Sequence, residues 1–291
     1  MARILVTGNA TVDHIVDLAA YPEEDSEGRA LGSETRPGGN AANTAVVLAQ
    51  AGHQVDLAAV VADGSAGDGL LEALAARGIG VGRCVRRPGN TPTSWILRSR
   101  ATGSRTIVHD RELPELHADA FRQEGLAGYD WFHFEGRNPE QLPALLRTAR
   151  RAAVDQPVSL ECEKPREGLG SSLRLADVLM FSSGWAQAHG LTEPEAFIAG
   201  AAQTRPGAVQ TLTWGDRGAW VTQHGQASHC APRAGLQVCD SLGAGDTFNA
   251  GLIHALISGE PPAQALERAV RLAERKLQRA GLDRLFEPPA R

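Results

Sequence analysis

Lysine is almost missing from this chain of 291 residues: 27 of the 29 basic residues are arginines, and the only lysines are Lys164 and Lys276. We assign no function to this bias by itself. Neither lysine lies in a G-x-x-x-x-G-K-[ST] segment, which excludes a P-loop. The formal charge is −5, without a basic surplus or stripe, so we expect no nucleic-acid partner.

Long apolar runs are missing as well. No stretch approaches the roughly 18 residues of a membrane-spanning helix, so no membrane partner is expected. The apolar core of residues 1–8 is too short for a signal peptide, and we interpret it as the first strand of a cytoplasmic protein.

Several catalytic and metal motifs are also absent. The four cysteines show no C-x-x-C spacing, and the nine histidines do not pair at ligand spacing. No G-x-S-x-G elbow occurs. The first strand is followed by Gly8-Asn9-Ala10 instead of G-x-G-x-x-G, which disfavours a nicotinamide dehydrogenase. We therefore assign no metal ligand.

Glycine, in contrast, is abundant: 32 of 291 residues, about 11%, against a usual share of about 7%. No collagen-like or low-complexity repeat accounts for this excess of glycine. Many glycines must therefore lie in turns or where the backbone approaches a ligand closely.

Short apolar runs alternate with longer segments of helical period, which predicts an α/β fold with a mainly parallel sheet and helices on both faces. The predicted strands are 4–7, 55–61, 131–135, 158–162, 177–182 and 209–214, and the predicted helices are 41–51, 67–77, 139–153 and 194–203. A last helix carries the stripe Leu266, Ala269, Val270, Ala273 and Leu277, which is typical of core packing.

Two regions do not follow this alternation of apolar strands and helices, because their strands have one polar face. They are residues 12–36 and 93–109, and the second contains a predicted hairpin turn at 101–104. No linker rich in proline or serine divides the chain. We therefore expect one domain over residues 1–291, with a small β-sheet lid formed by these two insertions.

The strongest chemical signal is a glycine-rich segment at 240–249, between a strand-like segment (235–239) and an apolar helix (248–257). Gly243 and Gly245 allow a sharp turn at a helix N-terminus, where free N–H groups form an anion pocket. Asp246 has two interpretations, a cap of its own helix or a general base that takes a proton from an attacking hydroxyl.

A second glycine signal, Gly38-Gly39, opens another helix. Asn40 and Asn43 follow one turn apart, so that their amides can face one side and bind a polyhydroxylated molecule. Asp13 and Asp25 could assist them. The alternatives are a simple helix cap for the asparagines and solvated surface positions for the acids.

A third signal is the strand 131–135 running into Glu135-Gly136-Arg137. Ligands of open α/β sheets bind at this carboxyl edge. The alternative is an ion pair at the surface.

Together these segments resemble the ribokinase-like (PfkB) family of sugar kinases. The two glycine signatures, Gly38-Gly39-Asn40 and 240–246, occur in the family's order. Four further blocks, 21–27, 105–108, 132–138 and 161–167, are similar to the ketohexokinase (fructokinase) branch of that family. The similarity covers about residues 4–284.

The resemblance implies a Rossmann-like domain whose β-sheet lid is commonly the homodimer contact, and ATP with Mg²⁺, often with stimulation by K⁺. It assigns Asp246 as the base and the amides of Gly243, Ala244 and Gly245 as the anion hole. The sugar contacts it implies are Asp13, Asp25, Gly39, Asn40, Asn43, Arg105, Glu135 and Arg137. The nucleotide would be bordered by Trp214, Gly215, Gly218, Ala219, Ala273 and Leu277.

Three positions depart from the family pattern: Ser104 replaces a usual Asn, Ser241 a usual Thr, and Ser183 a residue that is often Lys. They affect the choice of sugar more than the chemistry. The family's metal-linked acidic motif is not clear in this chain; Glu161 or Glu163 could act on a metal through water, and we assign no metal ligand. We therefore expect phosphoryl transfer from ATP to a ketose, D-fructose at O1. The alternatives are ribose, a 2-keto sugar derivative or a nucleoside as acceptor, or a regulator that binds sugar or nucleotide without catalysis.

Overall fold

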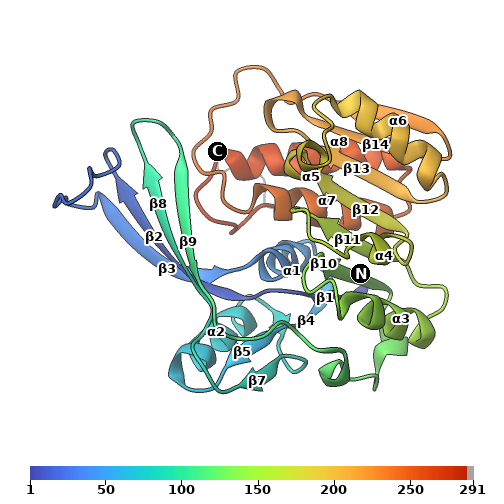
Figure 1. Ribbon diagram of the computed structural model, residues 1–291, viewed down its shortest axis with the longest axis horizontal. Coiled ribbons are helices and arrows are strands. Elements are labelled where there is room, and N and C mark those ends of the chain that lie inside the picture. Colours follow the sequence, from blue (N-terminus) through green and yellow to red (C-terminus); the bar gives the residue numbers. More distant parts are fainter. Residues whose placement is uncertain (287–291) are drawn as a thin grey trace.

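A nine-stranded sheet runs through the protein, and a four-stranded sheet projects to one side of it (Figure 1). The computed structural model describes residues 1–286. Neighbouring strands of the large sheet are parallel except for the two pairings made by β14 (Ala219–Gln223), which is antiparallel to both of its neighbours; this confirms the predicted mainly parallel sheet. In spatial order they are β15 (Gln226–Cys230), β14 (Ala219–Gln223), β13 (Val209–Thr213), β12 (Val178–Ser182), β11 (Val158–Cys162), β10 (Trp131–Glu135), β1 (Arg3–Thr7), β4 (Gln54–Ala58) and β6 (Ile79–Gly80).

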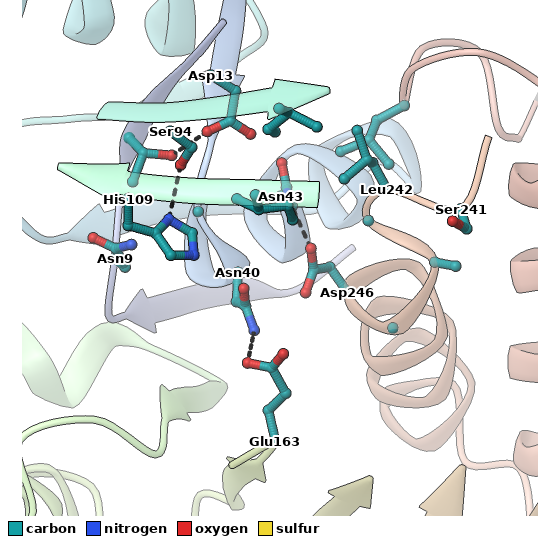
Figure 2. A pocket seen from close by; sticks show the side chains of 18 of the residues that line it. Asn9, Asp13, Asn40, Asn43, Ser94, His109, Glu163, Ser241, Leu242 and Asp246 are labelled. Atoms are coloured by element: carbon teal, nitrogen blue, oxygen red, sulfur yellow. Dashed lines mark hydrogen bonds between the residues drawn. The ribbon is translucent and has the colours of Figure 1, made fainter. Parts of the chain in front are cut away.

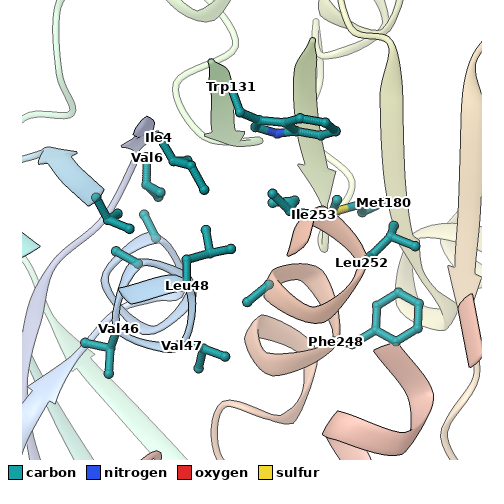
Figure 3. Packing of buried hydrophobic residues seen from close by; sticks show 14 of the residues in the cluster. Ile4, Val6, Val46, Val47, Leu48, Trp131, Met180, Phe248, Leu252 and Ile253 are labelled. Carbon is teal, nitrogen blue, oxygen red and sulfur yellow. The ribbon is translucent and has the colours of Figure 1, made fainter. Parts of the chain in front are cut away.

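Helices cover both faces of this sheet because side chains of each strand alternate between two cores. The helices are α1 (Asn40–Gln50), α2 (Ser65–Ala75), α3 (Leu142–Ala152), α4 (Gly170–Leu173), α5 (Ser183–Ala188), α6 (Pro194–Thr204), α7 (Ala244–Ile257) and α8 (Pro262–Leu277). Ile4 and Val6 join the core under α1, α2, α7 and α8, and Figure 3 shows them beside α1 and α7. Leu5 joins the core under α3, α5 and α6. Short 3₁₀ turns occupy Ala118–Ala120, Leu126–Gly128 and Gly215–Arg217.

The apolar stripe of α8 lies largely in the core, as predicted. Leu266, Ala269 and Val270 are buried in the core that also contains Ile4 and Val6, and Ala273 packs against the edge of that core. Within residues 1–286, the helices are all too short or too polar to cross a membrane.

Three predicted elements differ from the structure. The predicted strand 55–61 is interrupted at Ala59, because its second half, β5 (Val60–Ala62), leaves the large sheet and pairs with β7 (Val85–Arg87). Both halves consist largely of valine, leucine and alanine, so composition does not show the change of partner. The predicted strand 235–239 is irregular, since the Cys239 N–H donates to the Leu277 carbonyl of α8 instead of a neighbouring strand. Helix α7 begins at Ala244, one turn before the predicted start.

The small sheet has the order β3 (Gly32–Gly38), β2 (Thr11–Leu18), β8 (Thr93–Ser99) and β9 (Arg105–Asp110). The predicted turn at 101–104 joins the antiparallel strands β8 and β9. Alternation along these strands gives the sheet two different faces. Ser94, Ile96, Ile107 and His109 face a pocket beside the large sheet, whereas Trp95, which lies opposite Val108, is exposed on the other face.

Candidate active site

A cavity of about 290 Å³ lies between the small sheet and the carboxyl ends of the central parallel strands (Figure 2). Its walls are predominantly polar and come from β2, β8 and β9, from α1, from the segment after β11 and from the loop before α7. The polar residues include Asp13, Asn40, Asn43, Arg105, Arg137, Glu161, Glu163, Lys164 and Asp246. The sheet topology therefore brings together side chains from both glycine-rich segments.

Asp246 lies in the first turn of α7 and is buried. Its Oδ2 accepts a hydrogen bond of 2.7 Å from the side-chain amide of Asn43 on α1 (Figure 2). The helix begins after Gly243, and no side chain caps it there. The structure therefore favours a site residue over a helix cap as the interpretation of Asp246.

Burial raises the pKa of Asp246 to about 8, and the negative charges of Glu163, Glu135 and Asp13 act in the same direction. The hydrogen bond from Asn43 opposes this rise, because it stabilises the carboxylate. A carboxyl group that titrates near neutral pH has the proton affinity that suits a general base.

The loop before Asp246 is suited to an anion. Gly243 adopts a left-handed conformation with φ 77°, from which α7 starts. The first N–H groups of a helix have no partner inside it, and they lie at the positive end of its dipole. Arg105 of β9 reaches the same loop, where its Nη1 donates to Ser241 Oγ at 2.5 Å. A phosphoryl group placed here would meet backbone donors and a guanidinium together.

Two glycines at the junction of β3 and α1 pack where no side chain fits. A Cβ on Gly38 would lie 2.0 Å from Asp13 Oδ2. A Cβ on Gly39, whose φ is 95°, would lie 2.5 Å from the Asn9 carbonyl oxygen. This tight junction brings the start of α1 against β2. Asn40 and Asp13 consequently both line the pocket.

Glu161 lies near the end of β11 and is not among the site residues predicted from the sequence. Its Oε1 accepts hydrogen bonds from Asn249 at 3.0 Å and from Asn40 at 3.3 Å. Its Oε2 is buried without a hydrogen-bond partner. Burial, together with the charge of Asp246, raises the pKa of Glu161 well above its usual range. Glu163 follows Glu161 closely and accepts from Asn40 at 3.1 Å.

Glu135 and Arg137 form a pair, of which only Arg137 lines the pocket. Arg137 donates to Glu135 at 3.3 Å and to Glu115 at 2.8 Å. Glu135 also accepts the Asn9 N–H at 2.8 Å. The buried Glu135 carboxylate therefore supports the pocket wall from behind.

Some predicted site residues lie elsewhere. Asp25 is exposed in the connection between β2 and β3, away from the pocket. The proposed nucleotide residues are also outside it: Trp214, Gly215, Gly218 and Ala219 surround the turn between β13 and β14, and Ala273 and Leu277 lie on α8. Since α8 packs against β14, these two groups are neighbours.

The pocket also contains residues for which the sequence predicted no role, among them Asn9, Ser94, His109 and Lys164. A signal for His109 was present, because strand periodicity places it on the same face as Arg105. Ser94 Oγ and His109 Nδ1 lie 3.2 Å apart on neighbouring strands. Within residues 1–286, no group of three or more His, Cys, Asp or Glu side chains is arranged to hold a metal ion.

Comparison with known proteins places this geometry in a family. Residues 1–288 match the model of the pfkB family carbohydrate kinases. The chain is 32% identical to ketohexokinase from Mus musculus, an alignment that covers 97% of this chain and 98% of the mouse protein. It is 26% identical to the ATP-dependent ribose-1-phosphate kinase of Halopiger xanaduensis, over 92% of this chain and 90% of that protein.

Among solved structures, the ribokinase of Arabidopsis thaliana complexed with ribose and ATP superposes with a TM-score of 0.77 at 20% identity. The match covers 96% of this chain and 94% of that one. This likeness establishes the ribokinase-like fold. The family match and the identity to the mouse enzyme establish more: this chain belongs to the pfkB family of carbohydrate kinases, enzymes that transfer a phosphoryl group to a sugar hydroxyl.

Proposed function

We propose that the protein transfers the γ-phosphoryl group of ATP to a ketose, with D-fructose phosphorylated at O1. The observation that carries the proposal is the buried Asp246 carboxyl, which Asn43 holds beside the anion-binding start of α7. The 32% identity to mouse ketohexokinase supports the choice of a ketose.

Asp246 takes the proton from the sugar hydroxyl as that oxygen attacks the phosphorus atom. The amides of Gly243, Ala244 and Gly245, with Arg105, stabilise the negative charge on the transferring group. The enzyme thus contributes mainly position and electrostatic stabilisation.

The sugar lies on the lid side of Asp246 in this proposal. Asp13 and the amides of Asn40 and Asn43 offer acceptors and donors to its hydroxyls. Arg137 lines the pocket wall beside the sugar, in an orientation fixed by its two carboxylate partners, Glu115 and Glu135.

ATP enters with Mg²⁺ as a substrate complex. Its adenosine part lies between the β13–β14 turn and α8, next to Trp214, Gly218 and Ala273. Glu161 could bind water of the Mg²⁺ ion, since its Oε2 is buried near the pocket and has no hydrogen-bond partner.

A second copy of the chain covers the outer face of the lid, where Trp95 and Val108 lie side by side and are 51% and 59% exposed.

The test is an assay of ADP release with a panel of acceptors: D-fructose, ribose, ribose 1-phosphate, a 2-keto sugar derivative and a nucleoside. We expect D-fructose to give the highest kcat/KM and a 1-phosphate as product. A higher kcat/KM with ribose 1-phosphate would reassign the acceptor to that of the archaeal relative. ADP release that stays at background with every acceptor would instead indicate a binding protein that has lost catalysis.

A further inference from the structure

Lys276 is one of only two lysines in the chain, and its side chain is completely buried in the last turn of α8. Its Nζ lies 2.8 Å from the Asp240 carbonyl, 3.2 Å from the Arg279 carbonyl and 3.0 Å from Asp240 Oδ2. An ammonium has three N–H donors and no acceptor. Three oxygens around one nitrogen therefore match a charged ammonium.

These oxygens belong to two separate segments. Asp240 begins the loop that leads into α7, and Arg279 lies in the turn after α8. The Asp240 carboxylate holds both segments, since it also accepts the N–H groups of Leu242 at 2.9 Å and Gly281 at 3.1 Å. Lys276 thus neutralises and fixes the residue that connects them.

Other cations approach the same carboxylate less closely. Arg98 and Arg36 of the lid lie 3.4 and 3.6 Å from Asp240 Oδ2. Lys276 is the nearest, and it alone also binds the Asp240 carbonyl among these three cations. The position of the loop backbone therefore depends most on the ammonium.

This loop determines where the anion-binding amides point. Helix α7 starts after Gly243 without a side-chain cap, so the loop takes its position from outside the helix. A Cβ on Gly243 would already lie 3.0 Å from Leu282, in the same turn that Lys276 and Asp240 hold. Displacement of the turn would move the start of the helix.

We propose that Lys276 is a positioning residue for phosphoryl transfer, an internal monovalent cation that holds residues 240–243 so that the amides of 243–245 face the phosphoryl group. This inference rests on the proposed role of that loop. Carbonyl and carboxylate oxygens are also the ligands of K⁺. In this chain the ammonium already occupies that oxygen cage, so this position needs no added K⁺.

The first experiment compares Lys276→Met with Arg268→Met. Arg268 is a matched control because it is a cation on the same helix, 64% exposed, whose carboxylate partner is Glu260. We expect Lys276→Met to lower kcat by about 10–100-fold with little change in KM for the sugar, and Arg268→Met to change neither. Hydrogen exchange of residues 240–246 should become faster only in Lys276→Met.

The second experiment provides a small cation in place of the side chain. Lys276→Ala should recover part of its kcat in ammonium or potassium chloride, but not in tetramethylammonium chloride, whose cation is too large. Wild-type kcat should be equal in potassium, sodium and tetramethylammonium chloride, which tests the inference even if the variants do not fold.

Wild-type kcat and unchanged loop exchange in Lys276→Met would overturn the inference, as would a strong activation of the wild type by K⁺ over Na⁺. A wild type without turnover on any acceptor would contradict the proposed function instead. In that case the hydrogen exchange of residues 240–246 in Lys276→Met would still test whether Lys276 holds the loop in position.

Discussion

Asn43 on α1 donates a hydrogen bond of 2.7 Å to Asp246 on α7, a residue 203 positions later in the chain. This bond joins the two glycine-rich segments and orients the carboxylate within the pocket. It also stabilises the ionised form of a carboxyl group that burial would otherwise keep protonated.

Asp246→Asn should strongly lower turnover while substrate binding is retained. An amide cannot take a proton, so kcat should fall by about 100–10,000-fold. Binding of ADP, measured by calorimetry, serves as the control for an intact fold. Unchanged kcat in this variant would exclude Asp246 as the base.

Activity should depend on pH through the same carboxyl group. Since burial raises the pKa of Asp246 to about 8, kcat/KM for the sugar should rise with pH and level off above that value. Buffers of constant ionic strength between pH 6 and 10 would resolve the profile. A plateau that already begins at pH 6 would contradict the assignment.

Removing the amide of Asn43 should shift this profile. Because its hydrogen bond lowers the pKa of Asp246, Asn43→Ala should move the rise in kcat/KM to higher pH. Asn40→Ala is the matched control, since Asn40 binds Glu161 and Glu163 instead of Asp246. Identical pH profiles for Asn43→Ala and the wild type would show that this bond does not tune the base.

The buried Asp246 should lower the free energy of unfolding as the pH rises. Its pKa is higher in the folded than in the unfolded protein, so the folded state is favoured below about pH 4 and loses that advantage as the pH approaches 8. Asp246→Asn should therefore be more stable than the wild type at pH 8, by about 0.5–2 kcal/mol, with a smaller difference at pH 5. Urea unfolding at both pH values measures this difference, and a gain independent of pH would refute the explanation.

Gly39→Ala should destabilise the junction of β3 and α1. The φ of 95° is unfavourable for alanine, and the new Cβ would lie 2.5 Å from the Asn9 carbonyl. We expect a loss of about 1–3 kcal/mol in the free energy of unfolding. Gly28→Ala is the control, since nothing lies within 4 Å of its Cβ position. Equal stability of the two variants would show that the junction can relax.

The site was only partly predictable from local sequence. Asn40, Asn43, Arg105, Arg137 and Asp246 all line the pocket. Each carries a local signal in the sequence: a helix start at glycine for Asn40, Asn43 and Asp246, strand alternation for Arg105, and the end of a strand for Arg137. Glu161 and Lys164 join them only through the pairing of β11 with β10 and β12, which no local pattern specifies. Asp25 shows the reverse case, since its motif is present while its position in the fold is outside the pocket.

The amino-acid sequence by itself determined the alternation of strands and helices, the turn at 101–104 and the two helix starts at glycine. These features follow from short-range periodicity and from backbone conformations that only glycine adopts easily. Tertiary structure decided which distant groups share a low-dielectric environment. Burial raises the pKa of Asp246, and enclosure by three oxygens makes Lys276, which lies in no recognised motif, an internal cation. Both effects depend on contacts between segments that lie far apart in the chain, and local periodicity carries no information about them.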